Sequence, residues 1–330
     1  MLCTPDGKHL NPAARGWSRR PLHTANLRGR PLRTKKWDYW GVLAGDLAVG
    51  LVYADVGYAG LASVWWGDLV SHETGGVDVV TPFARGVELP DTPGTAPLVL
   101  DHPKLRMRLS DSPDGTHLYA RWTESDGSAG ELNVTAAMPD GHDSLSVVIP
   151  WSDTTFQFTT KDQARPTAGR LVRRGVEVPI GTDSPAWGVL DVGRGRWPYS
   201  IRWNWGGGAG RADSGEVVGV QFGAKWTEGT GFTENGVTVD GRMHKLGGEL
   251  DWRYDWDEPM APWRVVDPGG ALDLTLTPRL DKHTRTNAGV LSMEVHQVFG
   301  TWSGTLTAED GRLQRVDGIQ GFAEEARNRW

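Results

Sequence analysis

Short stretches in which apolar and polar residues alternate recur along most of this chain. Residues 217–226 (VVGVQFGAKW) and 271–278 (ALDLTLTP) place apolar side chains at every second position. A period of two is typical of β-strands that bury one face. Pro-Asp-Gly at 113–115 and Ser-Asp-Gly at 125–127 lie between further stretches of this kind and indicate tight turns. The pattern predicts an all-β protein built from antiparallel sheets.

The two ends of the chain depart from this alternation. Residues 1–36 are polar, basic and interrupted by proline and glycine, so we expect an irregular segment lying over the body of the protein. Residues 321–330 (GFAEEARNRW) place two apolar side chains one helical turn apart and predict a short C-terminal helix. Charge mixed with proline and glycine between 169 and 187 indicates a domain boundary. We therefore expect a first β domain at 37–175 and a second at 176–330, which ends in the helix.

Composition and charge narrow the function classes. The 330 residues include 44 glycines and 20 prolines, which fits many short strands joined by tight turns. A net charge of -6 without a large basic block argues against nucleic-acid binding. A single cysteine excludes a disulfide framework and a cysteine-based zinc site. No apolar run reaches membrane-spanning length, and the first residues lack the apolar core of a signal peptide. We expect a cytoplasmic protein with a small-molecule ligand; its oligomeric state is left open.

Tryptophan is unusually frequent, and 4 of the 17 tryptophans lie in the stretch 186–210. At period two, Trp203 and Trp205 share one face of a strand, and Arg202 and Asn204 share the other. Indole rings fill wide β-cores, but they also form the walls of pockets. Both interpretations stay open. The ligand-contacting residues expected for a pocket are Lys161, Gln163, Trp187, Trp197, Tyr199, Trp203, Asn204, Trp205, His244 and His296.

One carboxylate and one lysine stand out in this region. Asp191 lies between two tryptophans, and burial against indole would keep its carboxyl protonated near neutral pH, as a general acid requires. An ion pair with Arg194 or Arg196 is the alternative, and it would make Asp191 structural. Lys161 lies in a polar stretch, where a buried lysine would need a partner. Because lysine is rarely buried, a solvated position is the expected one.

Other acidic and histidine residues predict no metal site. Glu294 and His296 share a strand face, but two ligands do not make a metal site, and a polar outer face is the preferred interpretation. Asp251, Asp255 and Asp257 could offer oxygen ligands to calcium. Their spacing lacks the ordered glycine of a calcium loop, so we expect a solvated acidic loop. No metal and no cofactor are therefore predicted.

Several distinctive segments resemble a bacterial family defined as a domain of unknown function, DUF 2804. They are LNPAARGWSRRPL, KWDYWGV, TTKDQARPTAG, LDVGRGRWPYSIRWNWG, TENGVTVDGRMHKL, PWRVVD, QVFGTWSG and GFAEE, and they run from one end of the chain to the other. Glu234 lies in one of them, which makes it a second acid–base candidate. The family is distantly similar to two-domain calycin or lipocalin-like proteins, which include carotenoid hydratases. That similarity implies two barrel-like β domains with a ligand site near their junction.

These observations lead to one favoured function and two alternatives. The favoured one is an enzyme of lyase or isomerase type that hydrates, dehydrates or isomerises an apolar or polycyclic molecule by acid–base chemistry. Asp191 or Glu234 would donate the proton, while Lys161, Asn204 and Tyr199 would orient the substrate. The alternatives are a non-catalytic lipid or small-molecule binding protein and a carbohydrate hydrolase. The last would need two carboxylates facing each other about 5 to 9 Å apart.

Overall fold

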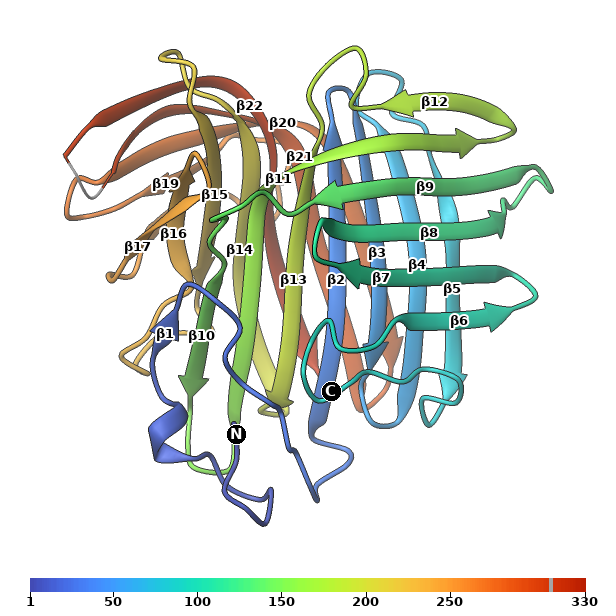
Figure 1. Ribbon diagram of the computed structural model, residues 1–330, viewed down its shortest axis with the longest axis vertical. Coiled ribbons are helices and arrows are strands. Elements are labelled where there is room, and N and C mark those ends of the chain that lie inside the picture. Colours follow the sequence, from blue (N-terminus) through green and yellow to red (C-terminus); the bar gives the residue numbers. More distant parts are fainter. Residues whose placement is uncertain (309–310) are drawn as a thin grey trace.

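Two antiparallel sheets make up the protein, and each curves into a barrel-like shape (Figure 1). The computed structural model describes residues 1–308 and 311–330. The first sheet is nearly closed, whereas the second forms half a barrel. The all-β prediction and the two barrel-like units are therefore confirmed. Among the described residues, no helix combines the length and apolarity that a bilayer crossing needs.

The first sheet contains thirteen strands of the described chain. They are β1 (Trp17–Ser18), β2 (Thr34–Ala44), β3 (Leu47–Asp55), β4 (Ala59–Asp68), β5 (Thr74–Pro82), β6 (Leu98–His102), β7 (Leu105–Ser112), β8 (Gly115–Thr123), β9 (Ala129–Ala137), β10 (Leu145–Pro150), β11 (Phe156–Arg173), β12 (Val176–Ile180) and β13 (Trp187–Arg196). The main order is β5-β4-β3-β2-β13-β11-β9-β8-β7-β6. The buried carboxylate of Glu124 helps to close the barrel, because it accepts hydrogen bonds from Trp66 of β4 at 2.7 Å and Trp122 of β8 at 2.8 Å.

A bulge in β11 separates two parts of the first sheet, whose strands run in different directions. The register with β13 shifts between Asp162 and Arg165, and Ala164 adopts a φ of 58°. Before the bulge β11 pairs with β10 and β13. After it β11 pairs with β13 for only two more residues, and then with β9 and β12. A bulge bends a strand and changes where its side chains point. The half of β11 that carries Lys161 consequently lies along β13, where it contacts the second sheet.

The second sheet contains nine strands of the described chain. They are β14 (Ser200–Arg211), β15 (Val217–Ala224), β16 (Asn235–Val239), β17 (Arg242–Leu246), β18 (Asp251–Arg253), β19 (Trp263–Val266), β20 (Leu272–Ala288), β21 (Leu291–Thr307) and β22 (Leu313–Arg329). Their order is β17-β16-β15-β14-β22-β21-β20-β19-β18. The chain passes from the first sheet to the second between Arg196 and Ser200. Sheet membership does not measure independent folding, so the domain division at 175 and 176 stays a prediction.

The predicted C-terminal helix is wrong, because residues 313–329 form the central strand β22. This strand is hydrogen-bonded to β14 on one side and to β21 on the other. Alanine, glutamate and arginine favour helix, but intrinsic propensity is a weak preference that tertiary pairing overrides. Phe322 and Ala326 also fit a period of two, with Glu324 between them on the same face.

The N-terminal segment crosses the outside of the first sheet, mostly without regular structure, as predicted. It contains the short 3-10 helix η1 (Pro12–Ala14) and the two-residue strand β1, which pairs with β10. Leu2, Cys3 and Leu10 are buried together with Phe156 and Phe158 of β11. These contacts hold the start of the chain against the body.

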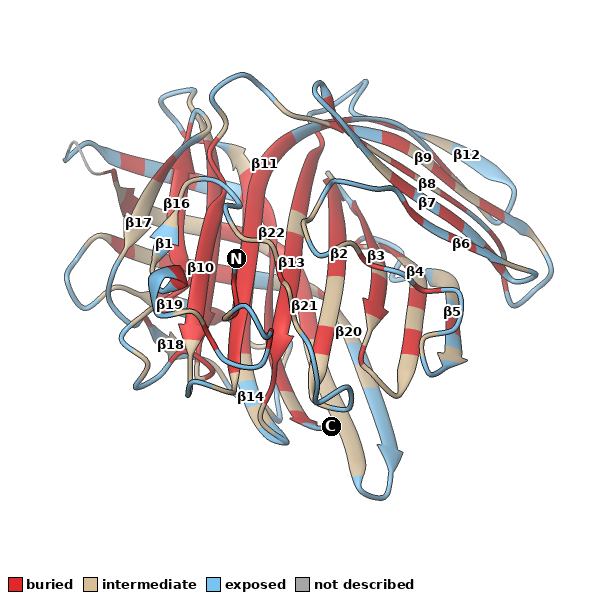
Figure 2. Cartoon of the chain, turned by 60° about the horizontal axis from the view of Figure 1, so that its bottom comes forward, coloured by how far each residue is buried: buried red, intermediate tan, exposed pale blue. Residues whose placement is uncertain are grey.

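The two sheets pack against each other through an aromatic core. Tyr39 and Val189 of the first sheet meet Trp205, Phe299 and Phe322 of the second. Figure 2 shows that β10, β11 and β13 are buried along most of their length. Strands covered on both faces can carry polar side chains only where these find partners inside the protein. The seam between the sheets holds several such side chains.

Candidate active site between the two sheets

Lys161 lies at the centre of a buried charged cluster in the seam. Its ammonium nitrogen is 2.9 Å from Asp191 Oδ1 and 3.2 Å from Glu234 Oε2. The three residues are only 5%, 7% and 1% exposed, in that order. Lys161 and Asp191 are directly paired on β11 and β13, whereas Glu234 comes from the segment between β15 and β16. One lysine therefore joins a carboxylate of the first sheet to a carboxylate of the second.

Two expectations about these residues are corrected. Lys161 is buried rather than solvated, because two carboxylates compensate the loss of water around its charge. Asp191 pairs with this lysine and not with the nearby arginines. Arg194 instead pairs with Asp38 at 2.7 Å, and Arg196 donates to backbone carbonyls of the N-terminal segment. The expectation for Lys161 rested on how often lysine is buried in proteins. That frequency does not include the partners that the fold brings to one particular lysine.

The electrostatics of the cluster favour proton exchange at Glu234. Burial raises the pKa of Glu234 to about 7, although the Lys161 ammonium opposes this rise. Burial alone would lower the pKa of Lys161, but Asp191 and Glu234 outweigh it and raise that pKa. The lysine is therefore charged at neutral pH, while Glu234 is divided between its two protonation states. A carboxyl group with a pKa near the working pH can both give and take a proton.

Fixed donors and a missing side chain set the position of each carboxylate. Trp226 donates from Nε1 to Glu234 Oε1 at 2.6 Å. A Cβ on Gly223 would lie 2.0 Å from that oxygen, so only glycine lets the carboxylate rest on β15. Asp191 accepts from Trp37 Nε1 at 3.2 Å and from the Thr159 hydroxyl at 3.2 Å. The carboxylates are thus held before any ligand arrives, which is the arrangement that catalysis requires.

Glu324 of β22 is a third buried carboxylate in the seam, and it was not among the predicted site residues. It accepts a hydrogen bond from Trp203 Nε1 at 2.7 Å. Burial raises its pKa to about 7, and both Lys161 and Asp191 act on it electrostatically. Interpreting residues 321–330 as a helix concealed this residue. The alternation of Phe322, Glu324 and Ala326 was the signal that could have placed it on an inward-facing strand.

Indole rings form one wall of the seam beside these carboxylates. The ring of Trp197 lies 4.9 to 5.8 Å from five other indole rings. These five rings belong to Trp37, Trp151, Trp203, Trp226 and Trp330. Four of the five are half-buried, the exception being Trp226, so the cluster reaches from the carboxylates to solvent. The Trp205 ring lies 4.6 Å from the Lys161 ammonium and covers it from the other side.

Amide side chains next to the lysine keep unused hydrogen-bonding capacity. Gln163 donates to Gln221 Oε1 at 2.9 Å, and Trp205 donates to the same oxygen at 3.1 Å. The Gln163 Oε1 and Gln221 Nε2 atoms are buried and have no hydrogen-bond partner. Buried polar atoms are nearly always satisfied by protein, water or ligand.

The remaining predicted ligand contacts lie outside this cluster. Asn204 faces the other side of β14 and donates to the Tyr254 hydroxyl at 2.9 Å. Trp187 packs with Ala164, which lies in the bulge of β11, and with Ala209 of β14. Tyr199 is 41% exposed and donates to the Val290 carbonyl. His244 is half-buried on the edge strand β17.

His296 occupies the opposite face of β21 from the seam. It shares that face with Glu294 and with Val298, which belongs to the core inside the second sheet. The pair therefore points into the curve of the sheet, which corrects the expected outer face. The acidic loop agrees with the prediction of solvation: Asp251 pairs with Arg253 at 2.6 Å, and its other acidic residues are exposed.

One solved structure of similar fold supports the architecture. An AttH candidate from Nitrosomonas europaea matches with a TM-score of 0.52 at 13% identity, over 90% of this chain and 93% of that one. Kievitone hydratase from Nectria haematococca has a TM-score of 0.49 at 11% identity, over 91% of this chain and 92% of that one. CghA has a TM-score of 0.47 at 11% identity, over 98% of this chain and 97% of that one. No curated protein matches. A family model described as a domain of unknown function (DUF2804) matches residues 1–330, and the chain belongs to this family, as its motifs predicted.

Proposed function

We propose that the protein is an enzyme that hydrates, dehydrates or isomerises a small apolar or polycyclic molecule by acid–base chemistry. The observation that carries the proposal is the pair of buried carboxylates joined by Lys161, one from each sheet. Burial raises the pKa of Glu234 to about 7, which suits a proton donor at neutral pH. The indoles beside it provide an apolar surface for the substrate.

In the proposed reaction, Glu234 acts as the general acid. Its carboxyl proton forms a new C–H bond with one carbon of a double bond, and the π electrons of that bond are used in doing so. The positive charge left on the other carbon is stabilised by the indole faces of Trp197 and Trp203. Water then bonds to that carbon through oxygen and loses its extra proton to the Glu234 carboxylate. The reverse sequence is dehydration, and loss of a proton from a neighbouring carbon instead is isomerisation.

Lys161 and Asp191 have positioning and electrostatic roles in this scheme. The lysine ammonium stabilises the Glu234 carboxylate that forms when the proton leaves. Asp191, held by Trp37 and Thr159, keeps the ammonium in place. The lysine also occupies the space between the two carboxylates. A glycosidase needs that space for the sugar and its scissile bond, so the geometry favours the acid–base enzyme over the carbohydrate hydrolase.

The test begins with the ligand itself. Native mass spectrometry of the purified protein identifies a molecule that stays bound, and its unsaturated or hydroxylated analogues are then incubated with the protein in H2¹⁸O. We expect ¹⁸O incorporation, or a double-bond shift, that falls about 10² to 10⁴-fold in Glu234→Gln. Glu88→Gln, which changes an exposed carboxylate, is the matched control.

Two outcomes would contradict the proposal. Full activity in both Glu234→Gln and Asp191→Asn would mean that these carboxylates take no part in the reaction. Retention of an unchanged ligand, without ¹⁸O incorporation or isomerisation in the wild type, would instead identify a binding protein.

A further inference from the structure

A second polar cluster lies inside the curve of the second sheet. His283 of β20 is directly opposite His296 of β21, and Glu294 lies two residues before His296 on the same face. The two imidazole rings stack in parallel, with centroids 4.1 Å apart. The exposed His283 ring must therefore turn for the in-plane lone pairs of both histidines to reach one ion. His283 Nε2 is 3.2 Å from Glu294 Oε1, and the ligand atoms of the three residues lie within 4.8 Å of one another. We propose that His283, His296 and Glu294 bind a divalent transition metal such as zinc.

A fourth residue prepares one of the histidines for metal binding. Asp281 Oδ2 is 2.7 Å from His296 Nδ1. A carboxylate that accepts a hydrogen bond from Nδ1–H leaves Nε2 with its lone pair free. It also fixes the orientation of the ring, and metal-binding histidines are commonly oriented in this way. Trp256 packs edge-on against the same ring at 4.6 Å and limits its rotation.

The types of ligand select the class of metal. Two imidazoles and one carboxylate suit zinc, cobalt, nickel or copper, and three protein ligands leave a coordination position open. Calcium requires six to eight oxygen ligands, which this cluster does not offer. Arg285 Nε lies 3.9 Å from Glu294 Oε1, so some positive charge already compensates this carboxylate. Neutral imidazoles must therefore supply most of the binding.

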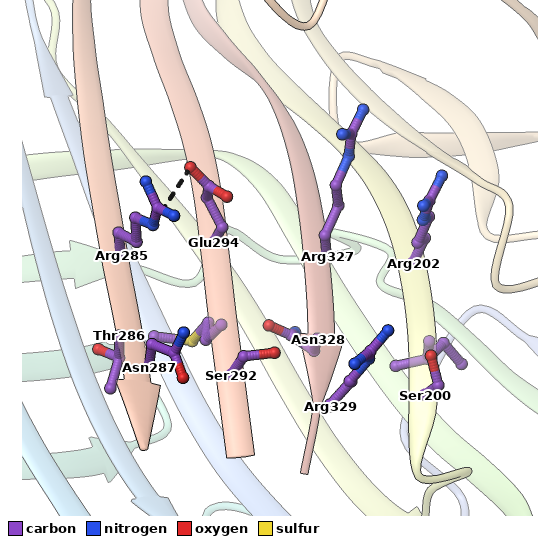
Figure 3. Close-up of a pocket in the computed structure, with 12 residues that line it drawn as sticks. Ser200, Arg202, Arg285, Thr286, Asn287, Ser292, Glu294, Arg327, Asn328 and Arg329 are labelled. Atoms are coloured by element: carbon purple, nitrogen blue, oxygen red, sulfur yellow. Dashed lines mark ion pairs between the residues drawn. The ribbon is translucent and has the colours of Figure 1, made fainter. Parts of the chain in front are cut away.

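The site lies at the edge of a hollow of about 290 Å³ at the ends of β14, β20, β21 and β22. Glu294 lines this hollow together with Arg202, Arg285, Arg327 and Arg329 (Figure 3). In the view of Figure 3, Arg285, Glu294, Arg327 and Arg202 stand in one row across the four strands. Guanidinium groups bind carboxylates and phosphates. An anion in the hollow is consequently the kind of ligand that would complete the coordination of the metal.

This inference is independent of the proposed acid–base function. His296 and Gln297 are neighbours on β21 and point to opposite faces of the sheet. The metal site faces the interior of the second sheet, and the carboxylate cluster faces the seam. Failure of one proposal would leave the other unaffected.

Metal titration tests the site directly. The protein is prepared without a histidine tag, stripped with a chelator and titrated with ZnCl2 by calorimetry, and separately with CoCl2 by visible absorption. We expect one metal per chain and cobalt bands typical of low coordination number. His283→Ala and His296→Ala should each weaken binding at least tenfold, while His9→Ala, which alters an exposed histidine outside the cluster, should leave it unchanged.

A positioning variant separates this site from adventitious binding. Asp281→Ala should weaken zinc binding roughly tenfold and shift the cobalt bands, because His296 loses the carboxylate that orients it. Circular dichroism verifies that each variant is folded, and His283 is exposed, so its replacement leaves the core intact. The proposal is overturned if the wild type binds no metal, or if His283→Ala binds as tightly as the wild type.

Discussion

Replacing Glu234 by glutamine is expected to stabilise the protein at neutral and alkaline pH. The carboxyl has a pKa of about 7 in the fold, compared with an ordinary value of 4.5. Ionising it inside the protein therefore costs the folded state about 3 kcal/mol relative to the unfolded chain. Glutamine has the same shape as the protonated acid and can still accept the hydrogen bond of Trp226, but it never ionises. The variant should avoid this cost.

The sign of the effect follows from proton binding. Between about pH 4.5 and pH 7 the folded state holds the Glu234 proton more tightly than the unfolded state does. Wild-type stability should therefore fall as the pH rises through this window, because of this group. Glu234→Gln should be about 3 kcal/mol more stable than the wild type near pH 8, and the difference should vanish near pH 4.

Urea unfolding followed by tryptophan fluorescence at several pH values measures the difference in the free energy of unfolding. Glu88→Gln, which replaces an exposed glutamate in the same way, is the matched control for the substitution itself. A glutamine variant that is less stable than the wild type at pH 8, or a difference that stays constant from pH 4 to pH 8, would refute the reasoning. A stabilised but inactive variant is the signature of a residue kept for function at the expense of stability.

Two further predictions concern the same cluster. Lys161→Met should destabilise the fold by about 3 to 5 kcal/mol at pH 8, because Asp191 and Glu234 lose their buried counter-ion. Urea unfolding should show a smaller loss of stability at pH 4, where Glu234 is protonated. Gly223→Ala should cost about 1 to 3 kcal/mol because the new methyl group collides with the Glu234 carboxylate, whereas Gly247→Ala, which has open space, should be near neutral in the same assay.

The candidate site was only partly predictable from single residues. Asp191 and Glu234 stood out because of their surroundings in the sequence, and the structure places both on one lysine. Lys161 was expected to be solvated because lysine is usually exposed. That average does not take into account two carboxylates that approach from distant strands. Glu324 was missed for a different reason. Its local sequence favours helix, and only pairing on both sides makes it part of a strand.

The alternation of apolar and polar residues determined the all-β class by itself, since the period of side chains along a strand is a local property. The motifs determined the family in the same way. The tertiary structure alone decided which polar side chains meet. Lys161 and Asp191 come together through the register of β11 and β13, and His283 and His296 through that of β20 and β21. Register and sheet packing depend on contacts between segments far apart in the chain, and no pattern within a single segment encodes them.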